Sequence, residues 1–130
     1  MKGLPIARLP VLAGESSPLY VVTVADRGGR LADRAPLRHL GWGPGTRLRI
    51  HLLDDMSLFV TPAPGADAVT PQGHLRLPLP VRRLCRIEAG TRLLVVAWAD
   101  SASLTVCRTS ALDAVLRPRL FIDRGETSGG

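Results

Sequence analysis

The chain contains one residue pattern twice, and this repeat constrains its fold more than any other feature. The first copy spans residues 29–60 and the second spans residues 73–106. Both open with Gly-x-Leu, continue with Pro-aliphatic-Arg and share the run Gly-Thr-Arg-Leu, with a one-residue difference in length between helix and turn. Self-similarity at a fixed period indicates that one structural unit occurs twice.

Each copy predicts a strand, a turn, an extended piece, a short helix and a hairpin, in that order. A β-rich run at residues 19–24 precedes the first copy, and a weaker run at residues 68–70 precedes the second. Leu75, Leu77 and Leu79 alternate as they would in an extended segment. Pro36 and Pro80 stand where short helices begin. Hairpin strands are expected at residues 47–53, 58–61, 92–98 and 104–107.

A unit of about 40 residues with this much strand edge does not bury its apolar side chains or its backbone donors alone. Because the chain carries two such units, we expect them to interlock as one pseudo-twofold β-barrel. The predicted fold class is mainly β with short helices.

The repeat resembles the AbrB/SpoVT family of swapped-hairpin DNA-binding regulators. The second copy follows the family spacing without a gap, although His74, Cys85 and Arg86 replace its Arg, Leu and Gly. The first copy departs from the pattern at Asp33 and Arg34. The positions that fit are Gly73, Leu75, Leu77, Pro78, Val81, Arg82, Ile87 and Gly90, and Gly29, Arg30, Leu31, Leu37, Arg38, Leu40, Gly41 and Gly45. The resemblance implies two tandem swapped-hairpin repeats.

Two repeats in one chain are similar to the MraZ branch of this family, whose members assemble into rings. That branch has an Asp, three residues and an Arg at the first turn, which Asp26 and Arg30 match. The second copy has Thr70 and His74 at these places and does not match.

The resemblance implies double-stranded DNA as a partner, held by arginines at the first turn and at the helix start. A single Arg beside a short helix is otherwise most often a solvated surface residue. Matched by position, the implied residues are Arg30, Arg38 and Arg82, with His39 and Arg83 beside them. The basic stretch from residue 74 onward adds His74, Arg76 and Arg86.

The formal net charge of +6 and the sequence pI near 10.9 favour a polyanionic partner. All but one of the 17 basic residues are arginines, which a GC-rich genome would also produce. The arginine fork grips a phosphate or a guanine edge with two hydrogen bonds.

Nothing in the sequence predicts an active site, a cofactor or a metal. Cys85 and Cys107 form no CxxC pair and are expected to be small buried residues. Trp42 and Trp98 lie in apolar runs and are expected to pack in the core. No nucleophile elbow, phosphate-binding loop or dinucleotide fingerprint occurs, so the chain is expected not to be an enzyme.

The predicted organisation has four parts. Residues 1–18 form a flexible arm, residues 19–64 the first repeat and residues 65–110 the second. Residues 111–130 form a short helix, capped by Ser110, and a disordered tail. No apolar run is long enough for a signal core or a membrane span, so a cytoplasmic protein without a membrane partner is expected.

The leading functional hypothesis is a sequence-specific transcriptional regulator that binds DNA as a homo-oligomer. One alternative is an assembly module of the same fold that does not bind DNA, which the substitutions within the motif favour. Another is an antitoxin whose C-terminal tail binds a toxin.

Overall fold

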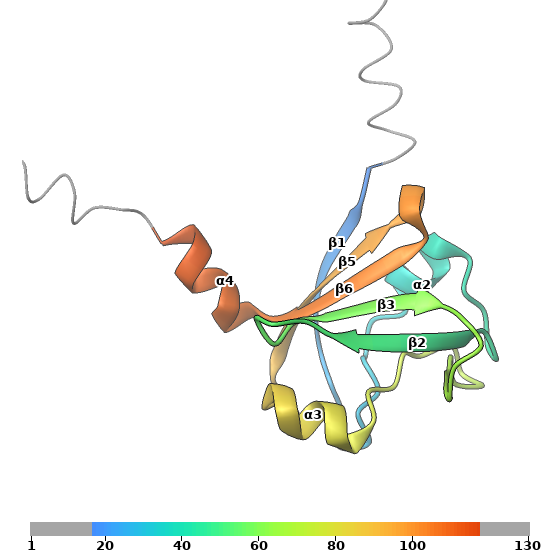
Figure 1. Ribbon diagram of the computed structural model, residues 1–130, viewed down its shortest axis with the longest axis horizontal. Helices are drawn as coiled ribbons and strands as arrows, with labels where there is room; N and C mark the ends of the chain where they lie inside the picture. The colour runs from blue at the N-terminus through green and yellow to red at the C-terminus, as the bar shows by residue number, and fades with distance from the viewer. Residues whose placement is uncertain (1–16, 118–130) are drawn as a thin grey trace, which may run out of the picture.

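One antiparallel sheet of six strands organises the chain, and a computed structural model describes residues 17–117 (Figure 1). The strand order is β1-β5-β6-β3-β2-β4. The strands are β1 (Leu19–Val24), β2 (Arg47–Leu52), β3 (Leu58–Pro62), β4 (Asp67–Ala68), β5 (Arg92–Trp98) and β6 (Ser103–Arg108). The helices are α2 (Ala35–Leu40), α3 (Leu79–Cys85) and α4 (Thr109–Leu116), with a 3-10 turn, η1 (Ala99–Ser101), between β5 and β6.

Two hairpins form the middle of the sheet. Strands β2 and β3 make the first hairpin, β5 and β6 make the second, and β3 and β6 join them side by side. Strand β1 then pairs with β5, and strand β4 pairs with β2. Each edge strand is therefore bonded to the hairpin from the other half of the sequence.

The same backbone contact occurs once in each half of the chain. The turn after α2 is anchored where Gly45 donates its N–H to the carbonyl of Val69 at 2.9 Å. The turn after α3 is anchored in the same way, where Gly90 donates to Ala25 at 2.9 Å. Helix α2 has six residues and α3 has seven, so the halves differ in length by one residue in the helix.

The core lies on the inner face of the sheet, because alternate residues of each strand point to the same side. Inward positions are mostly aliphatic in the long strands, with Thr23 of β1 as a buried polar exception, and those of the two hairpins are nearly all fully buried. They include Leu48, Leu58, Val60, Leu93, Val95, Leu104 and Val106. Trp42 is buried, as the sequence predicted, but Trp98 is only half-buried and is not part of the core, because its ring N–H donates to Thr105 Oγ1 beside the exposed Tyr20.

Most predicted elements are confirmed, and two details are wrong. Leu75 and Leu77 are buried as expected, but Leu79 belongs to α3 and is 44% exposed. The extended segment therefore ends at Pro78, before the last leucine of the alternating series, because α3 already begins at Leu79. Helix α4 begins at Thr109 without a side-chain cap, so Ser110 is not its N-cap.

The predicted fold class is confirmed at the level of a mainly β protein with short helices, but the barrel is not closed. Within residues 17–117, no pairing joins β1 to β4, and these two strands form the edges of the sheet. The predicted flexible arm and disordered tail fall largely on residues 1–16 and 118–130, which lie outside the described residues. No helix among the described residues is long and apolar enough to cross a membrane.

We expect Leu58→Ala and Leu104→Ala each to lower the free energy of unfolding by about 2–5 kcal/mol, because both side chains are fully buried. They occupy corresponding places in the two hairpins, where Leu58 pairs with Leu52 and Leu104 pairs with Ala97. Urea denaturation followed by circular dichroism measures the change. The control is Leu84→Ala, whose side chain is 59% exposed and should shift stability by only about 0.5 kcal/mol. A cost as small as that of the control at either leucine would contradict this account of the core.

Candidate nucleic-acid interface

Two loops, one from each half of the chain, lie next to each other, and their backbones pair. We call residues 26–34 and 70–78 the crossover. In the first loop Gly29 donates its N–H to the carbonyl of Asp26 at 3.0 Å, which closes a tight turn. In the second loop Gly73 donates to Thr70 at 2.8 Å in the same way. Both glycines have a positive φ, +88° and +89°, which L side chains rarely adopt.

The loops then run antiparallel to each other. Leu31 donates its N–H to the carbonyl of Leu75, and Leu77 donates to Gly29, both at 2.8 Å. The side chains of Leu31, Leu75 and Leu77 are buried in the core. Backbone hydrogen bonds between the two loops, together with the packing of their leucines in the core, therefore fix the position of the crossover.

Arg30 and Arg76 lie directly opposite each other in this pairing. The flanking bonds leave them as a non-hydrogen-bonded pair, in which facing side chains approach most closely and share one face. Both residues are exposed. Like charges in this arrangement repel, so other contacts must hold the two guanidinium groups in place.

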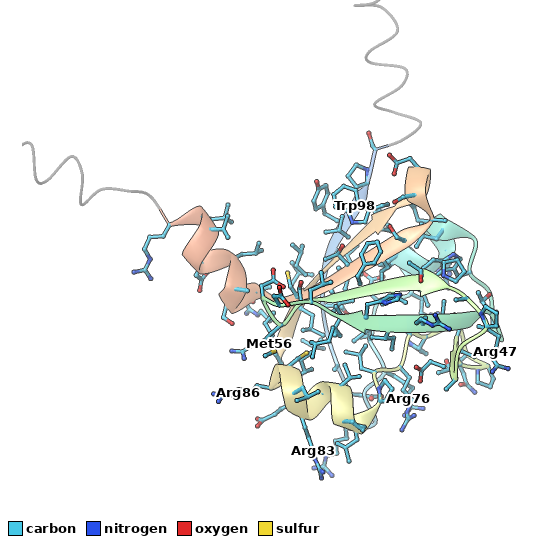
Figure 2. All side chains as sticks on the ribbon, viewed as in Figure 1. Arg47, Met56, Arg76, Arg83, Arg86 and Trp98 are labelled. Carbon is cyan, nitrogen blue, oxygen red and sulfur yellow. The ribbon has the colours of Figure 1, made fainter. Side chains whose placement is uncertain are left out.

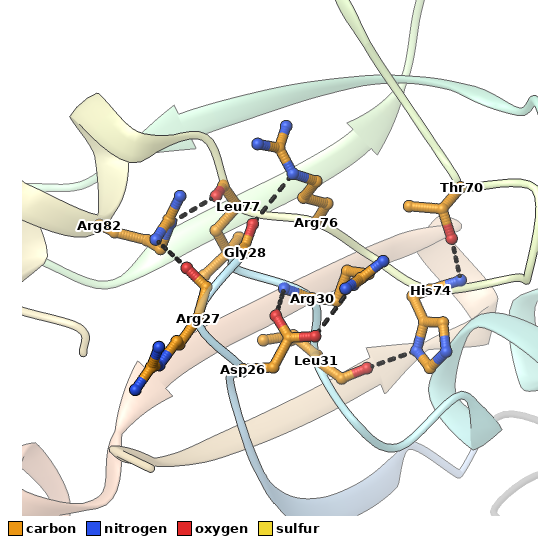
Figure 3. A network of polar contacts seen from close by, with 10 residues as sticks. All are labelled: Asp26, Arg27, Gly28, Arg30, Leu31, Thr70, His74, Arg76, Leu77 and Arg82. Carbon is orange, nitrogen blue, oxygen red and sulfur yellow. Dashed lines mark hydrogen bonds and ion pairs between the residues drawn. The ribbon is translucent and has the colours of Figure 1, made fainter. Parts of the chain in front are cut away.

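Each of these arginines is held through its Nε atom (Figure 3). Arg30 donates Nε–H to Oδ2 of Asp26 at 2.9 Å, and its backbone N–H to Oδ1 at 2.8 Å. Arg76 donates Nε–H to the carbonyl of Gly28 at 2.9 Å. In the described part of the chain, these side-chain bonds use Nε only, so the terminal amino groups of both arginines stay available to a ligand.

Among residues 17–117, Asp26 is the one carboxylate that forms an ion pair with an arginine of the crossover. Hydrogen bonds from the backbone and side chain of Arg30 hold the pKa of Asp26 below its usual value, so the carboxylate stays ionised at neutral pH. It neutralises part of one arginine and orients it.

Arg82 lies in the last turn of α3, not at the helix start that the sequence predicted, and its side chain is bonded to two backbone carbonyls. It donates Nε–H to the carbonyl of Leu77 at 2.8 Å and Nη1–H to the carbonyl of Arg27 at 3.1 Å. Its side chain also lies against Gly29, where a Cβ atom would collide with the Leu77 carbonyl and with Nε of Arg82. Arg82 therefore ties α3 to the opposite loop.

His74 and Arg34 connect the same two loops from the other direction. Nδ1 of His74 lies 2.8 Å from the carbonyl oxygen of Leu31. Arg34 donates Nη1–H to the carbonyl of Gln72 at 3.0 Å. His74, which the sequence predicted as a DNA contact, thus has one ring nitrogen committed to the backbone.

The remaining predicted residues lie on the two helices. Arg83 and Arg86 are exposed on or just after α3, and Figure 2 shows them with Arg76 along the same side of the molecule. Arg38 and His39 are exposed in the last turn of α2, a separate helix. The structure thus brings Arg30, His74, Arg76 and Arg82 together, places Arg83 and Arg86 beside them and leaves Arg38 and His39 apart.

Sequence reasoning missed Arg27 and Arg34, which both belong to the crossover. Arg27 is exposed in the first turn and offers its carbonyl to Arg82. The signal was present in the run Asp-Arg-Gly-Gly-Arg, which already placed one arginine at this turn. What the sequence did not indicate is that Arg34 would reach a carbonyl 38 residues away.

The positive charge of the described chain is concentrated in two segments. Residues 26–38 and 70–88 hold eight arginines and three acidic residues, Asp26, Asp33 and Glu88. All other residues from 17 to 117 hold five arginines and five acidic residues, which balance. The whole excess therefore comes from the crossover and the two helices that follow its loops.

The two cysteines lie away from the crossover and are both free thiols. Burial raises the pKa of Cys85 and of Cys107, so both stay protonated at neutral pH and are poor nucleophiles. Cys85 is buried, as predicted, and Cys107 is half-buried. From residue 17 to residue 117, no group of three or more His, Cys, Asp or Glu residues is placed to hold a metal ion.

The chain matches no family model, no curated protein and no solved structure.

We expect Gly29→Ala to destabilise the protein by about 2–4 kcal/mol, because a positive φ and a collision with the Leu77 carbonyl act together. The matched control is Gly41→Ala, which has a φ of +73° but open space around its Cβ, and which should cost about 1 kcal/mol. Urea denaturation of both variants separates strain from collision. Equal losses would mean that the crossover tolerates a methyl group at Gly29.

Proposed function

We propose that this protein is a sequence-specific DNA-binding transcriptional regulator that binds duplex DNA through the crossover. The observation that carries the proposal is the pair Arg30 and Arg76, held opposite each other with their terminal amino groups unbonded in the described chain. Two guanidinium groups fixed side by side suit adjacent phosphates or a guanine edge.

The distribution of charge supports the same partner. Arg83 and Arg86 extend the positive surface from the crossover along α3. Phosphate contacts of this kind position a protein on DNA, while directed contacts to base edges supply the sequence preference. Arg82 and His74 act in this proposal mainly as supports, because carbonyl oxygens already occupy them.

We further propose that the halves are tandem swapped-hairpin repeats, as the resemblance to the AbrB/SpoVT family implies. The exchanged pairing of β1 with β5 and of β4 with β2 supports this interpretation. So do the matching turns at Gly29 and Gly73. In this proposal the protein works in the cytoplasm as a homo-oligomer.

We expect Arg30→Ala and Arg76→Ala each to weaken binding to duplex DNA by about tenfold or more, since each removes a charged group from the interface. The slope of log affinity against log salt should become shallower by about one for each phosphate that the variant no longer neutralises. Fluorescence anisotropy with labelled genomic fragments, titrated at several salt concentrations, measures both quantities. The fragments should include the DNA upstream of the protein's own gene.

The control for this experiment is Arg49→Ala. Arg49 is an exposed arginine of β2, outside the crossover, so its removal changes the net charge by the same amount. Arg82→Ala serves as a second comparison, because it should lower both binding and stability. If Arg49→Ala weakens binding as much as the crossover variants do, the interface is elsewhere. Binding that is absent, or indifferent to salt, would refute the proposal and favour an assembly module.

A further inference from the structure

Strand β1 forms one edge of the sheet, and from Leu19 to Thr23 no other described strand pairs with its outward side. Its sequence, Leu-Tyr-Val-Val-Thr-Val, contains no charged residue and no proline. Exposed edges in soluble proteins are normally blocked by charges, prolines or bulges, because their free backbone groups attract another strand. The opposite edge, β4, has only two residues, one of them Asp67.

The backbone bonds at the end of β1 show which of its groups face outward. The carbonyl of Ala25 accepts from Gly90 on the β5 side, and the carbonyl of Val24 accepts from Ala32, each at 2.9 Å. Backbone groups of an antiparallel strand alternate between its two sides. Tyr20 and Val22 therefore point their N–H and C=O groups the same way as Val24, away from β5. No strand among the described residues pairs with this side.

We propose that β1 pairs antiparallel with β1 of a second copy of this chain, about a twofold axis at Val21. In this register Tyr20 faces the partner's Val22, and Val22 faces the partner's Tyr20. Each of these two pairs exchanges two backbone hydrogen bonds, which gives four in total. The ladder ends there, because Ala32 of the same chain already lies opposite Val24 on the outward side and donates to its carbonyl, so the partner strand turns away at Pro18.

The side chains on the same stretch suit this partner. Tyr20 is 60% exposed and Val22 is 58% exposed, and both point to the outer face of the sheet. In the proposed register each aromatic ring lies across from a β-branched side chain, a favourable cross-strand pair. The Tyr20 ring is already oriented by edge-on contact with Trp98, at a centroid distance of 6.5 Å.

Charge favours a second copy at this edge and disfavours a polyanion. The strand is neutral although the chain carries a net charge of +6, so two copies meet here without direct repulsion. The crossover begins just after the C-terminal end of β1, and antiparallel pairing points the two C-terminal ends in opposite directions. The inference does not depend on DNA binding.

The test is sedimentation equilibrium of the full-length protein without DNA, across a range of concentrations. We expect a reversible monomer–dimer equilibrium for the natural chain. Val22→Pro removes an outward N–H that the monomer does not use, and proline is tolerated in that position on an edge strand. It should weaken dimerisation by about tenfold or more. Val22→Thr keeps the N–H and the β-branched shape, so it is the matched control and should still dimerise.

Amide hydrogen exchange of the natural chain, read by NMR, gives a second test that needs no variant. The amides of Tyr20 and Val22 should be protected at concentrations where the protein is a dimer and exchange rapidly where it is a monomer. The amides of Val21 and Thr23, which face β5, should be protected at both. A protein that stays monomeric, a dimer that survives Val22→Pro, or protection of Tyr20 and Val22 in the monomer would each overturn the proposal. The last result would mean that another part of the same chain covers the edge.

Discussion

Backbone pairing between distant parts of the chain is the constraint on which this structure depends. Strand β1 finds its partner in β5, and β4 finds its partner in β2, so neither edge strand is bonded to its own half of the sequence. The crossover adds a third exchange, in which Leu31 and Leu75 join the two loops. Each half forms its own hairpin, but its remaining strand and its loop find their backbone partners in the other half.

The crossover also explains how several arginines share a small surface without being neutralised. Arg76 and Arg82 are held by carbonyl oxygens, which accept hydrogen bonds but carry no net charge. Of the crossover arginines, Arg30 is the one whose side chain bonds to a carboxylate in the described part of the chain. A surface fixed by carbonyls keeps its positive potential, whereas one fixed by carboxylates would cancel it. Carbonyl oxygens also do not titrate, so most of this arrangement is insensitive to pH.

Sequence reasoning predicted the elements well because their signals are local. The spans of β1 and β5 follow from runs of β-branched and aliphatic residues, and Pro36 and Pro80 mark the two short helices. The error at Leu79 has a local cause as well, since its leucine spacing continued past the point where the helix begins. The open sheet was not predicted, because closure depends on how β1 and β4 lie in space and not on their composition.

The candidate site was only partly predictable for a related reason. A basic stretch can be read from the sequence, but the acceptor of each guanidinium cannot. Arg82 bonds to a carbonyl 55 residues away, and Arg76 bonds to one 48 residues away. Backbone acceptors leave no mark in the sequence, because every residue has one. Only the structure therefore shows which arginines hold the two loops together and which leave their terminal amino groups unbonded.

The pairing of β1 with β5 has a consequence for synthesis on the ribosome. Strand β1 is made early, but its partner is among the last elements of the sheet to be made. Long-range pairings of this kind slow folding, because closing the large loop costs conformational entropy before the hydrogen bonds that compensate for it can form. During that interval an apolar, uncharged strand has no partner, and unpaired strands of this kind favour aggregation of a nascent chain.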